Sequence, residues 1–527
     1  MRRWIRIAAL LALAALLAGL TGCGQEEKEH FTFSAAVVGR PAGFDPALAA
    51  SEGEEIAAVH LYENLMRLKN SESGTEVVGA LASSWECSDN LDGTETYIFH
   101  LRSDARWSDG RSVWAADFVY AWQHLVAETT DAPRAALLDM VAGYEEARAG
   151  DPDALQVRAK DRNTLEVVLR CRCPYFLRSV CTVAATMPRR ADLPDRSEPV
   201  TNGPYTLESY SDGVLTMTAS DKYYDRTRLG PDTVTIHYCD TAEQAVKLLE
   251  DRTVDFVCGV DDEAAAEQGE WHREPCPETA VLIVNQMTQQ LDDQELRQAL
   301  FLSIDRTKLA ELTGSALHTP ASGLVPDGIT ASDGSDFRTP EDIHIDNDDY
   351  SGSCELAREL LENAGVTRLT DVTLLCADEA DAAAVAEEIC RGWQEQLGLT
   401  VQLRRVSPEE LSDALIGGAF HMALINCKAD RNDAESMLQM WQSGHPENYA
   451  QFHASAYDML LRVAAASSSA EARDAYLSDA ERLLVEQGNV IPLFYTNRVY
   501  RMRSGLTGLV SDGMGVFRFD SIRPTAS

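Results

Sequence analysis

The chain has 527 residues, too many for one hydrophobic core, so several domains are expected. Hydrophobic residues make up 45% of the chain and charged residues 25%, a globular composition that excludes general disorder. The formal net charge of −38 excludes nucleic acid as a partner, because a polyanion would be repelled over the whole surface.

The first residues predict an export signal. Three arginines precede an uninterrupted apolar run over residues 7–20, which is shorter than the ~20 residues that a membrane-spanning helix needs. Residues 1–22 are therefore interpreted as a signal peptide. Cys23 follows directly, and Leu-Thr-Gly-Cys resembles the bacterial lipobox, in which the thiol receives a diacylglyceryl group. We expect lipid attachment at Cys23, a tether over residues 23–30, and a mature chain held on the extracytoplasmic face of the cell membrane, at the cell surface or in the periplasm.

The cysteines do not indicate a metal site. If Cys23 carries lipid, eleven of the twelve cysteines remain, which is an odd number. Cys171, Cys173 and Cys181 lie close in sequence, but their spacing is not that of a CxxC motif, and no histidine follows at zinc-finger spacing. Disulfide pairing cannot be read from the sequence, and most of these residues are expected to be small buried side chains.

The first part of the chain alternates between strand and helix patterns. Period-two alternation predicts a strand over residues 31–37, and helical spacing of apolar residues predicts a helix over residues 54–67. A strand over residues 97–102, a turn-rich connection over 103–110 and a helix over 115–128 follow.

The segment from Phe99 to Trp122, FHLRSDARWSDGRSVWAADFVYAW, carries a resemblance to a known family. It is similar to the hallmark F-x-L-R-x-(D/N)-x-x-(W/F)-(S/H)-D-G-x-P-(V/L)-T-A-x-D-F-V-(Y/F)-(S/A)-W of the solute-binding lipoproteins of peptide ABC importers. These are the oligopeptide- and dipeptide-binding proteins, or family 5 solute-binding proteins. Two departures are visible: Ser112 stands in place of the proline, and Trp114 in place of the threonine that would cap the helix.

Further segments resemble the same family along the mature chain. They are LASSWE at residues 81–86, NGPY at 202–205, LLEDRTVDF at 248–256, LRQALFLSIDRTK at 296–308, LARELLENAG at 356–365 and IPLF at 491–494.

The resemblance implies an α/β fold, a two-lobed clamp of the periplasmic-binding-protein type, class II, with an additional third domain. By position, lobe one would gather residues 31–73, 200–300 and 489–527. The extra domain would be residues 74–199 and lobe two residues 301–488. Three crossings would join the lobes, which suits hinge closure on a ligand.

The stretch from Phe420 to Leu438 is the candidate binding segment. An apolar run that begins at Met422 breaks into a cluster of charged residues, so a buried strand delivers a carboxylate to an interior surface. The resemblance implies that Asp430 binds the amino terminus of a peptide. Cys427 stands where the family pattern has tryptophan, and Arg431 where it has tyrosine; Arg431 is also a possible internal counter-ion for Asp430.

Main chain is expected to flank the ligand on two sides. The resemblance implies that Glu63, Asn64 and Leu65 on one side, and Asn426, Cys427 and Lys428 on the other, lie beside the peptide as added strands. The Glu63 carboxylate would assist at the amino terminus, or else be a surface carboxylate at the end of a helix.

Enzymatic motifs are absent from the sequence. There is no GxSxG, SxxK, HExxH, P-loop or GxGxxG, and the eleven histidines do not cluster. No catalytic residue, metal or cofactor is therefore predicted. His421 is interpreted as an interior histidine, and Trp393 or Trp441 as the tryptophan most suited to face the cleft.

The resulting hypothesis is a membrane-tethered monomer that captures extracellular oligopeptides and hands them to an ABC permease. Within the same fold, the alternatives are receptors for dipeptides, a nickel chelate, haem or an oligosaccharide. From another class, a secreted hydrolase is the alternative.

Overall fold

The computed structural model describes residues 30–71, 74–193, 199–260, 271–314, 317–339, 343–467 and 469–525. The predicted signal peptide, Cys23 and the predicted tether up to residue 29 lie outside these ranges. Within them, every helix is too short or too polar to cross a membrane.

One large mixed sheet runs through the molecule in the order β15-β14-β16-β12-β17-β11-β1-β10-β9-β8, with β13 added beside β17. Its strands are β1 (Thr32–Val38), β8 (Tyr205–Ser211), β9 (Val214–Ala219), β10 (Thr233–Cys239), β11 (Phe256–Cys258), β12 (His272–Val284), β13 (His318–Pro320), β14 (Thr373–Ala377), β15 (Gln402–Val406), β16 (Met422–Lys428) and β17 (Val490–Met502).

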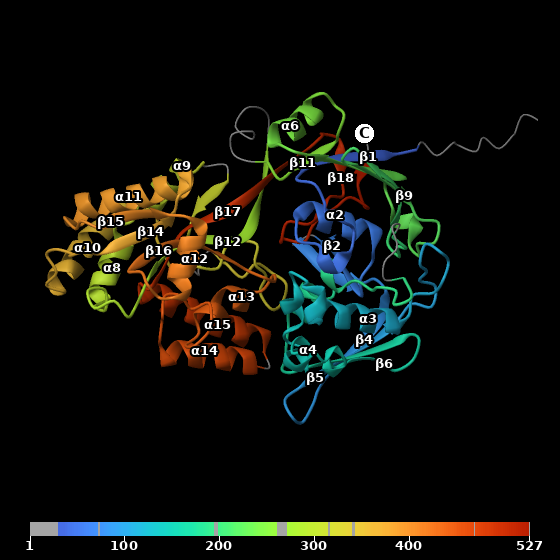
Figure 1. Cartoon of the computed structure of the whole chain (residues 1–527), viewed down its shortest axis with the longest axis horizontal. Helices are drawn as coiled ribbons and strands as arrows, with labels where there is room; N and C mark the ends of the chain where they lie inside the picture. Colours follow the sequence, from blue (N-terminus) through green and yellow to red (C-terminus); the bar gives the residue numbers. More distant parts are fainter. Residues whose placement is uncertain are drawn as a thin grey trace, which may run out of the picture.

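The two longest strands join the two halves of this sheet. Antiparallel β12 and β17 have 13 residues each; β17 pairs with β11 at one end, and β12 pairs with β16 at the other. Figure 1 shows them crossing between the two halves of the molecule. The register of their ladder shifts between Pro275 and Thr279, so the crossing contains a local irregularity.

We call the half that contains β1 and β8–β11 region A. Its other elements are α2 (Glu52–Leu61), α6 (Ala242–Glu250), the hairpin of β2 (Met66–Ser71) and β3 (Gly74–Gly79), and the short strands β18 (Leu506–Thr507), β19 (Val510–Ser511), β20 (Phe517–Arg518) and β21 (Arg523–Pro524). The helix predicted over residues 54–67 ends at Leu61, where the chain becomes extended at Tyr62. Leu65 and Met66 continue the helical spacing of apolar residues but lead into β2, which explains the error.

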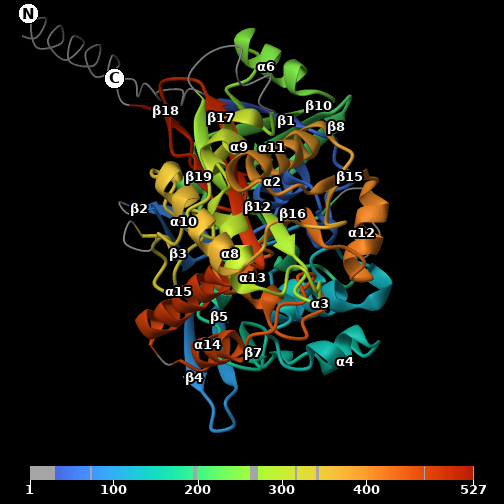
Figure 2. The ribbon, with the colours of Figure 1, turned by 90° about the vertical axis from the view of Figure 1, so that its left-hand side faces the viewer.

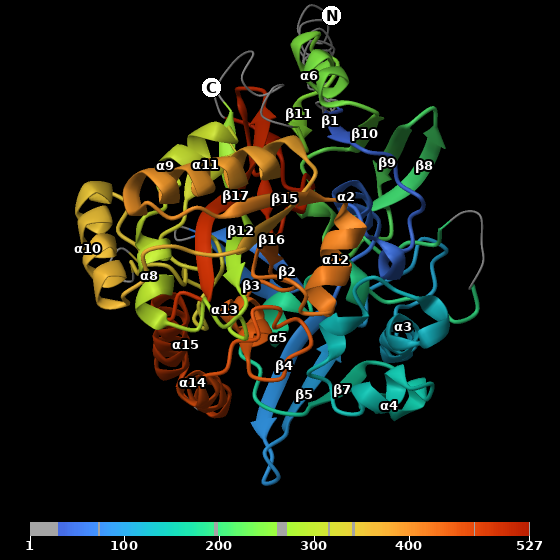
Figure 3. The same ribbon diagram turned by 60° about the vertical axis from the view of Figure 1, so that its left-hand side comes forward.

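Residues 82–193 form region B around a second sheet of order β4-β5-β7-β6. Its elements are β4 (Ala82–Asp89), β5 (Glu95–Leu101), α3 (Ala115–Val126), the one-turn helix η3 (Ala135–Leu138), α4 (Tyr144–Arg148), β6 (Val157–Ala159), β7 (Thr164–Leu169) and α5 (Phe176–Ser179). Figures 2 and 3 show the β4–β5 hairpin extending away from the rest of the molecule. At the start of α3, Trp114 N donates to the Asp117 carboxylate at 2.9 Å, which is one of the two bonds of a capping box. The Trp114 side chain makes no cap hydrogen bond, so the bond that a threonine would form is missing.

Region C is the other half of the large sheet, with β13–β16 and the helices that cover them. These helices are α8 (Gln294–Leu302), α9 (Arg306–Leu312), α10 (Tyr350–Asn363), α11 (Ala380–Leu397), α12 (Pro408–Ile416), α13 (Ala434–Leu438), α14 (Ser455–Ala466) and α15 (Ala470–Glu486). The LRQALFLSIDRTK segment forms two helices, because Asp305 caps a new one after α8. The next residue, Arg306, is buried and donates to Pro492 O in β17 at 2.7 Å; burial lowers its pKa to about 9.

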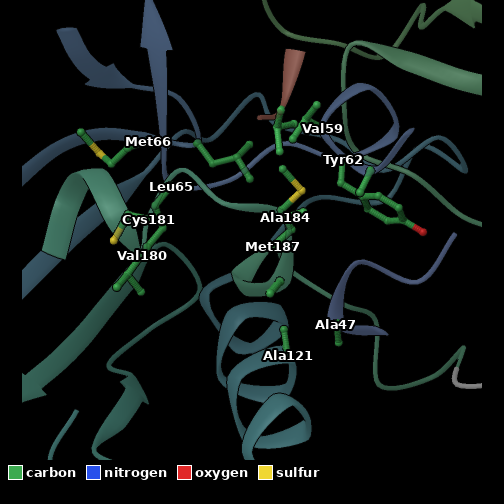
Figure 4. Packing of buried hydrophobic residues seen from close by; sticks show 14 of the residues in the cluster. Ala47, Val59, Tyr62, Leu65, Met66, Ala121, Val180, Cys181, Ala184 and Met187 are labelled. Atoms are coloured by element: carbon green, nitrogen blue, oxygen red, sulfur yellow. The ribbon is translucent and has the colours of Figure 1, made fainter. Parts of the chain in front are cut away.

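The apolar core is divided unequally among the regions. Regions A and B share one continuous cluster, and Figure 4 shows Val59, Tyr62, Leu65 and Met66 of region A beside Val180, Cys181, Ala184 and Met187 of region B. Region C has two clusters of its own, one on each face of its sheet. Regions A and B are therefore packed as one body.

Two residues of the NGPY segment contact the main chain at the end of α2 and directly after it. The Asn202 side chain accepts from Glu63 N at 3.3 Å and donates to Glu63 O at 3.2 Å. Gly203 lies so close that a Cβ atom there would be 2.5 Å from Leu61 C and Tyr62 N. Only glycine fits beside this main chain without displacing it.

Candidate functional site

Strand β16 has an uncovered edge at its carboxyl end. One side pairs with β12 from Met422 to Lys428, whereas the other pairs with β14 only at Met422 and Ala423. In the part of the chain that the structure describes, no strand covers this second edge from Leu424 onward. The side chains of Asn426 and Lys428 are exposed. The edge therefore offers main-chain donors and acceptors to an extended segment.

Cys427 does not face this open space. Its side chain is fully buried in the apolar cluster of region C, and burial raises the pKa of its thiol. The tryptophan of the family pattern is thus replaced by a small core residue.

Asp430 lies two residues beyond β16 with its side chain 46% exposed. Its Oδ1 accepts from Ser436 Oγ at 2.5 Å, and Ser436 Oγ in turn accepts from Asp430 N at 2.9 Å. Its Oδ2 accepts from Arg431 Nη1 at 3.3 Å. Helix α13, which Asp433 caps, places Ser436 under the loop. The result is a fixed carboxylate with one side open to a cationic ligand.

Arg431 is almost completely buried beside it. Its Nη2 donates to Gln439 Oε1 at 3.1 Å, and its guanidinium carbon lies 4.8 Å from the centre of the Tyr175 ring. Its Nη1 is 3.9 Å from Asp139 Oδ2. Burial by itself lowers the pKa of Arg431, but Tyr175, Asp430 and Asp139 together raise it above the ordinary value. The side chain therefore remains a cation.

The residues after Arg431 hold the loop between regions B and C. Asn432 O accepts from Ser179 Oγ of region B at 3.1 Å, and Asn432 Oδ1 accepts from Thr330 N of region C at 2.7 Å. Arg473 donates two hydrogen bonds to the buried Asp433 carboxylate, at 2.7 and 3.1 Å. The position of Asp430 is therefore set from both regions.

Region B contributes residues that sequence reasoning missed. Arg134 pairs with the Glu55 carboxylate and donates to Asp430 O at 3.5 Å, across 296 residues of chain. Asp139 and Tyr175 contact Arg431 from the same region. No local pattern points to contacts over such separations. The only hint is that charged residues flank the apolar helix η3 on both sides.

Glu63 is fully buried in region A, so the expectation of a surface carboxylate at a helix end is wrong. Tyr223 Oη donates to Glu63 Oε2 at 2.5 Å, and Arg67 Nη1 lies 3.9 Å from the same oxygen. Arg518 Nη2 lies 3.8 Å from Oε1. The carboxylate is therefore neutralised inside region A.

The neighbouring main chain is also occupied. Asn64 and Leu65 are buried, and Leu65 O accepts from Ala80 N and Ala82 N at 3.0 Å each. Asn64 O accepts from Leu81 N at 3.0 Å. Of the two predicted flanks, the one in region C has an uncovered edge, and the one in region A is closed by the chain itself.

Neither tryptophan expected at the cleft lies there. Trp393 and Trp441 are fully buried, and Trp393 Nε1 donates to Leu300 O at 3.0 Å. This expectation is wrong, because both rings fill the core of region C. His421 is half-buried, and its Nδ1 accepts from Thr373 N at 3.3 Å, so this ring nitrogen has a partner within the protein.

Among the described residues, no three His, Cys, Asp or Glu side chains gather as ligands for a metal ion. The eleven cysteines in these ranges are all free thiols.

Comparison with known proteins gives a consistent result. The family model described as bacterial extracellular solute-binding proteins, family 5 Middle, matches residues 76–449. The periplasmic murein peptide-binding protein MppA of Escherichia coli K12 is 28% identical over 477 residues, covering 87% of this chain and 86% of that protein. The dipeptide-binding protein DppE of Bacillus subtilis 168 is 26% identical over 499 residues, covering 90% and 88%.

The structural comparison agrees. The unliganded open form of MppA superposes with a TM-score of 0.82 at 24% identity, covering 94% of this chain and 98% of that one. A further structure of MppA from Escherichia coli gives a TM-score of 0.68 over 94% of this chain and 99% of that one. The fold is the α/β fold of class II periplasmic binding proteins with an additional third domain, as expected.

The matched family consists of binding proteins and not of enzymes. Because its model spans more than half of the sequence, the chain belongs to the bacterial extracellular solute-binding proteins of family 5.

Proposed function

We propose that this chain is the substrate-binding lipoprotein of a peptide importer, which captures extracellular oligopeptides between two lobes and delivers them to an ABC transporter permease. The observation that carries the proposal is the half-exposed Asp430 carboxylate at the end of an uncovered strand edge. An α-ammonium group and an extended main chain are common to all unmodified peptides. The names of MppA and DppE, a murein peptide-binding and a dipeptide-binding protein, support peptides as the ligand class.

In this proposal the main chain of Asn426, Cys427 and Lys428 receives the peptide backbone, and Asp430 receives its amino terminus. Glu63, Asn64 and Leu65 have a supporting role, because their internal bonds fix the part of region A that follows α2. Main-chain recognition does not depend on side chains, so a range of sequences would be accepted.

The proposed lobes are residues 31–73, 200–300 and 489–527 for lobe one, and 301–488 for lobe two, with 74–199 as the extra domain. The shared apolar cluster of regions A and B, and the separate clusters of region C, support this division. The better superposition on the open form of MppA supports an arrangement in which the lobes are apart and close on a ligand.

We also propose that Cys23 carries a lipid after the signal peptide is removed, and that the monomeric chain works on the extracytoplasmic face of the membrane. The lipobox-like sequence supports this anchor. Globomycin, an inhibitor of lipoprotein signal peptidase, tests this proposal. In its presence the full-length precursor should accumulate. For a Cys23→Ser variant, the amount of precursor should be the same with and without the drug.

The binding proposal is tested by calorimetry with trialanine and N-acetyltrialanine. Asp430→Asn should weaken binding of trialanine roughly 30-fold, about 2 kcal/mol, because a charge-assisted bond to the ammonium group is lost. Binding of the acetylated peptide should change less than about twofold, since it has no ammonium group. An equal loss for both peptides would remove Asp430 from the site.

A matched control is Glu355→Gln, which removes an exposed carboxylate on α10 at the far side of region C. It should leave the binding of both peptides unchanged. Native mass spectrometry of the unrefolded protein separates the ligand classes, because a peptide receptor would release a series of peptide masses. A single sugar, haem or metal chelate would contradict the proposal.

A further inference from the structure

One cation in the site lies between two carboxylates. Arg431 Nη1 is 3.3 Å from Asp430 Oδ2 and 3.9 Å from Asp139 Oδ2. Asp430 belongs to region C, and Asp139 follows helix η3 of region B. The guanidinium group therefore has a second anionic partner on the opposite side of the junction.

Asp139 is suited to take up this cation. Its side chain is 25% exposed, and its Oδ1 is a buried atom without a hydrogen-bond partner within the described ranges. Burial raises the pKa of its carboxyl group, and Arg431 opposes this rise. The other cation nearby, Arg170, is 3.7 Å away on a side chain that is 55% exposed, so solvent screens it. The Asp139 carboxylate therefore lies beside Arg431 through Oδ2 and keeps a second oxygen, Oδ1, without a hydrogen-bond partner in the described part of the chain.

The surroundings of Arg431 allow its Nη1 to move from the Asp430 carboxylate to the Asp139 carboxylate without loss of its other contacts. The Tyr175 ring supports the face of the guanidinium group, and Gln439 holds Nη2, whereas both carboxylates use Nη1. The helix η3 is joined to the loop at its start, because Arg134, which precedes it, donates to Asp430 O at 3.5 Å. Both carboxylates therefore stay within reach of the same nitrogen.

A peptide ammonium group at Asp430 would meet Arg431 as a like charge. Like charges this close in a partly buried site repel each other, because water screens them poorly there. We propose that Asp139 is a positioning residue: it draws Arg431 away from Asp430 when the amino terminus of a ligand arrives. This inference rests on the proposed function and names a residue of region B that sets the strength of the amine site.

The experiment is a double-mutant cycle with calorimetry of trialanine and N-acetyltrialanine. Asp139→Asn should weaken trialanine binding about fivefold and leave the acetylated peptide unchanged, because Arg431 then stays on Asp430. Asp139→Glu keeps the carboxylate and should restore the wild-type ratio of the two affinities. In an Arg431→Gln background, the Asp139→Asn change should have no effect on that ratio.

Two results would overturn the inference. One is an equal loss for both peptides in Asp139→Asn, which would indicate a structural role only. The other is an Asp139→Asn effect that persists without Arg431. If the Arg431→Gln variant does not fold, the affinity ratios of Asp139→Asn and Asp139→Glu alone test the inference. Glu146→Gln, which changes an exposed carboxylate on α4, is the control.

Failure of this inference is distinct from failure of the proposed function. If Asp430→Asn discriminates between the two peptides but Asp139→Asn does not, only the role of Asp139 is lost. If Asp430→Asn does not discriminate, the amine site and this inference are lost together.

Discussion

Region B meets region A and region C in two different ways. Its junction with region A is apolar and continuous, with Leu65 and Met66 packed beside Val180 and Cys181 (Figure 4). Within the described ranges it shares no apolar cluster with region C. There the contacts are hydrogen bonds, ion pairs and the stacking of Arg431 on Tyr175.

This difference indicates that the junction between regions A and B is the more stable of the two. Burying an apolar side chain contributes about 1.5–3 kcal/mol, and separating the surfaces loses all of it. Each charged or cation–π contact at the second junction contributes about 1–2 kcal/mol, and water replaces part of it when the surfaces separate. Regions A and B should therefore move as one body, and region C should move against them.

The largest expected effect breaks the apolar junction. Leu65→Ala should lower the free energy of unfolding by about 3 kcal/mol, because a fully buried side chain is replaced by a cavity. Hydrogen exchange should rise in both β1 and β5, which belong to regions A and B. Leu374→Ala in region C is the matched control, and its exchange should rise in β14 and β16 instead. Increased exchange in region A alone would show that A and B are separate units.

A second prediction concerns pH at the crossing strands. Glu274 of β12 lies opposite Arg498 of β17, accepts from Ser511 Oγ, and has Asp512 and Glu52 nearby. Burial is the main reason that its pKa is raised to about 7. The folded protein thus binds an extra proton between about pH 4.5 and 7, so the free energy of unfolding should fall as pH rises through this window.

Glu274→Gln should remove this part of the pH dependence, about 2 kcal/mol between pH 5 and 8. The measurement is urea unfolding of both proteins across that range. Because burial also raises the pKa of Asp512 and Glu52, the informative quantity is the difference between the two proteins. Identical slopes would show that Glu274 is not protonated in the folded state.

The smallest effect is expected at the junction of regions B and C. Tyr175→Leu keeps an apolar side chain but removes the ring that stacks on Arg431. It should lower the free energy of unfolding by about 1 kcal/mol or less. Its signature is faster hydrogen exchange over residues 429–433, with the rest of region C unchanged. Tyr175→Phe retains the ring and serves as the control. A loss as large as that of Leu65→Ala would contradict the comparison between the junctions.

Sequence patterns predicted elements whose stability is local. The strand over residues 97–102 is β5, and the helix that begins at Ala115 is α3, because both depend on spacing within a few residues. The helix over residues 54–67 was too long for the same reason: Leu65 and Met66 keep the spacing while Asn202 holds the chain extended. Local spacing does not report a contact from residue 202.

The candidate site was predictable only in part. The position of Asp430 after a buried strand followed from the sequence, and the structure adds its exposure and its bond to Ser436. The burial of Glu63 and the stacking of Arg431 on Tyr175 depend on residues more than a hundred positions away. Such contacts are fixed by the tertiary fold, and no local pattern encodes them.

Strand β17 lies in the middle of the large sheet although its residues come near the end of the chain. Region A cannot complete its sheet until this strand has been added, because β11 pairs with it. Region C needs the same strand, because Val490 and Ile491 belong to its two apolar clusters and β13 pairs with β17. Synthesis runs from the amino terminus, so both halves stay incomplete until residues 490–502 have been made.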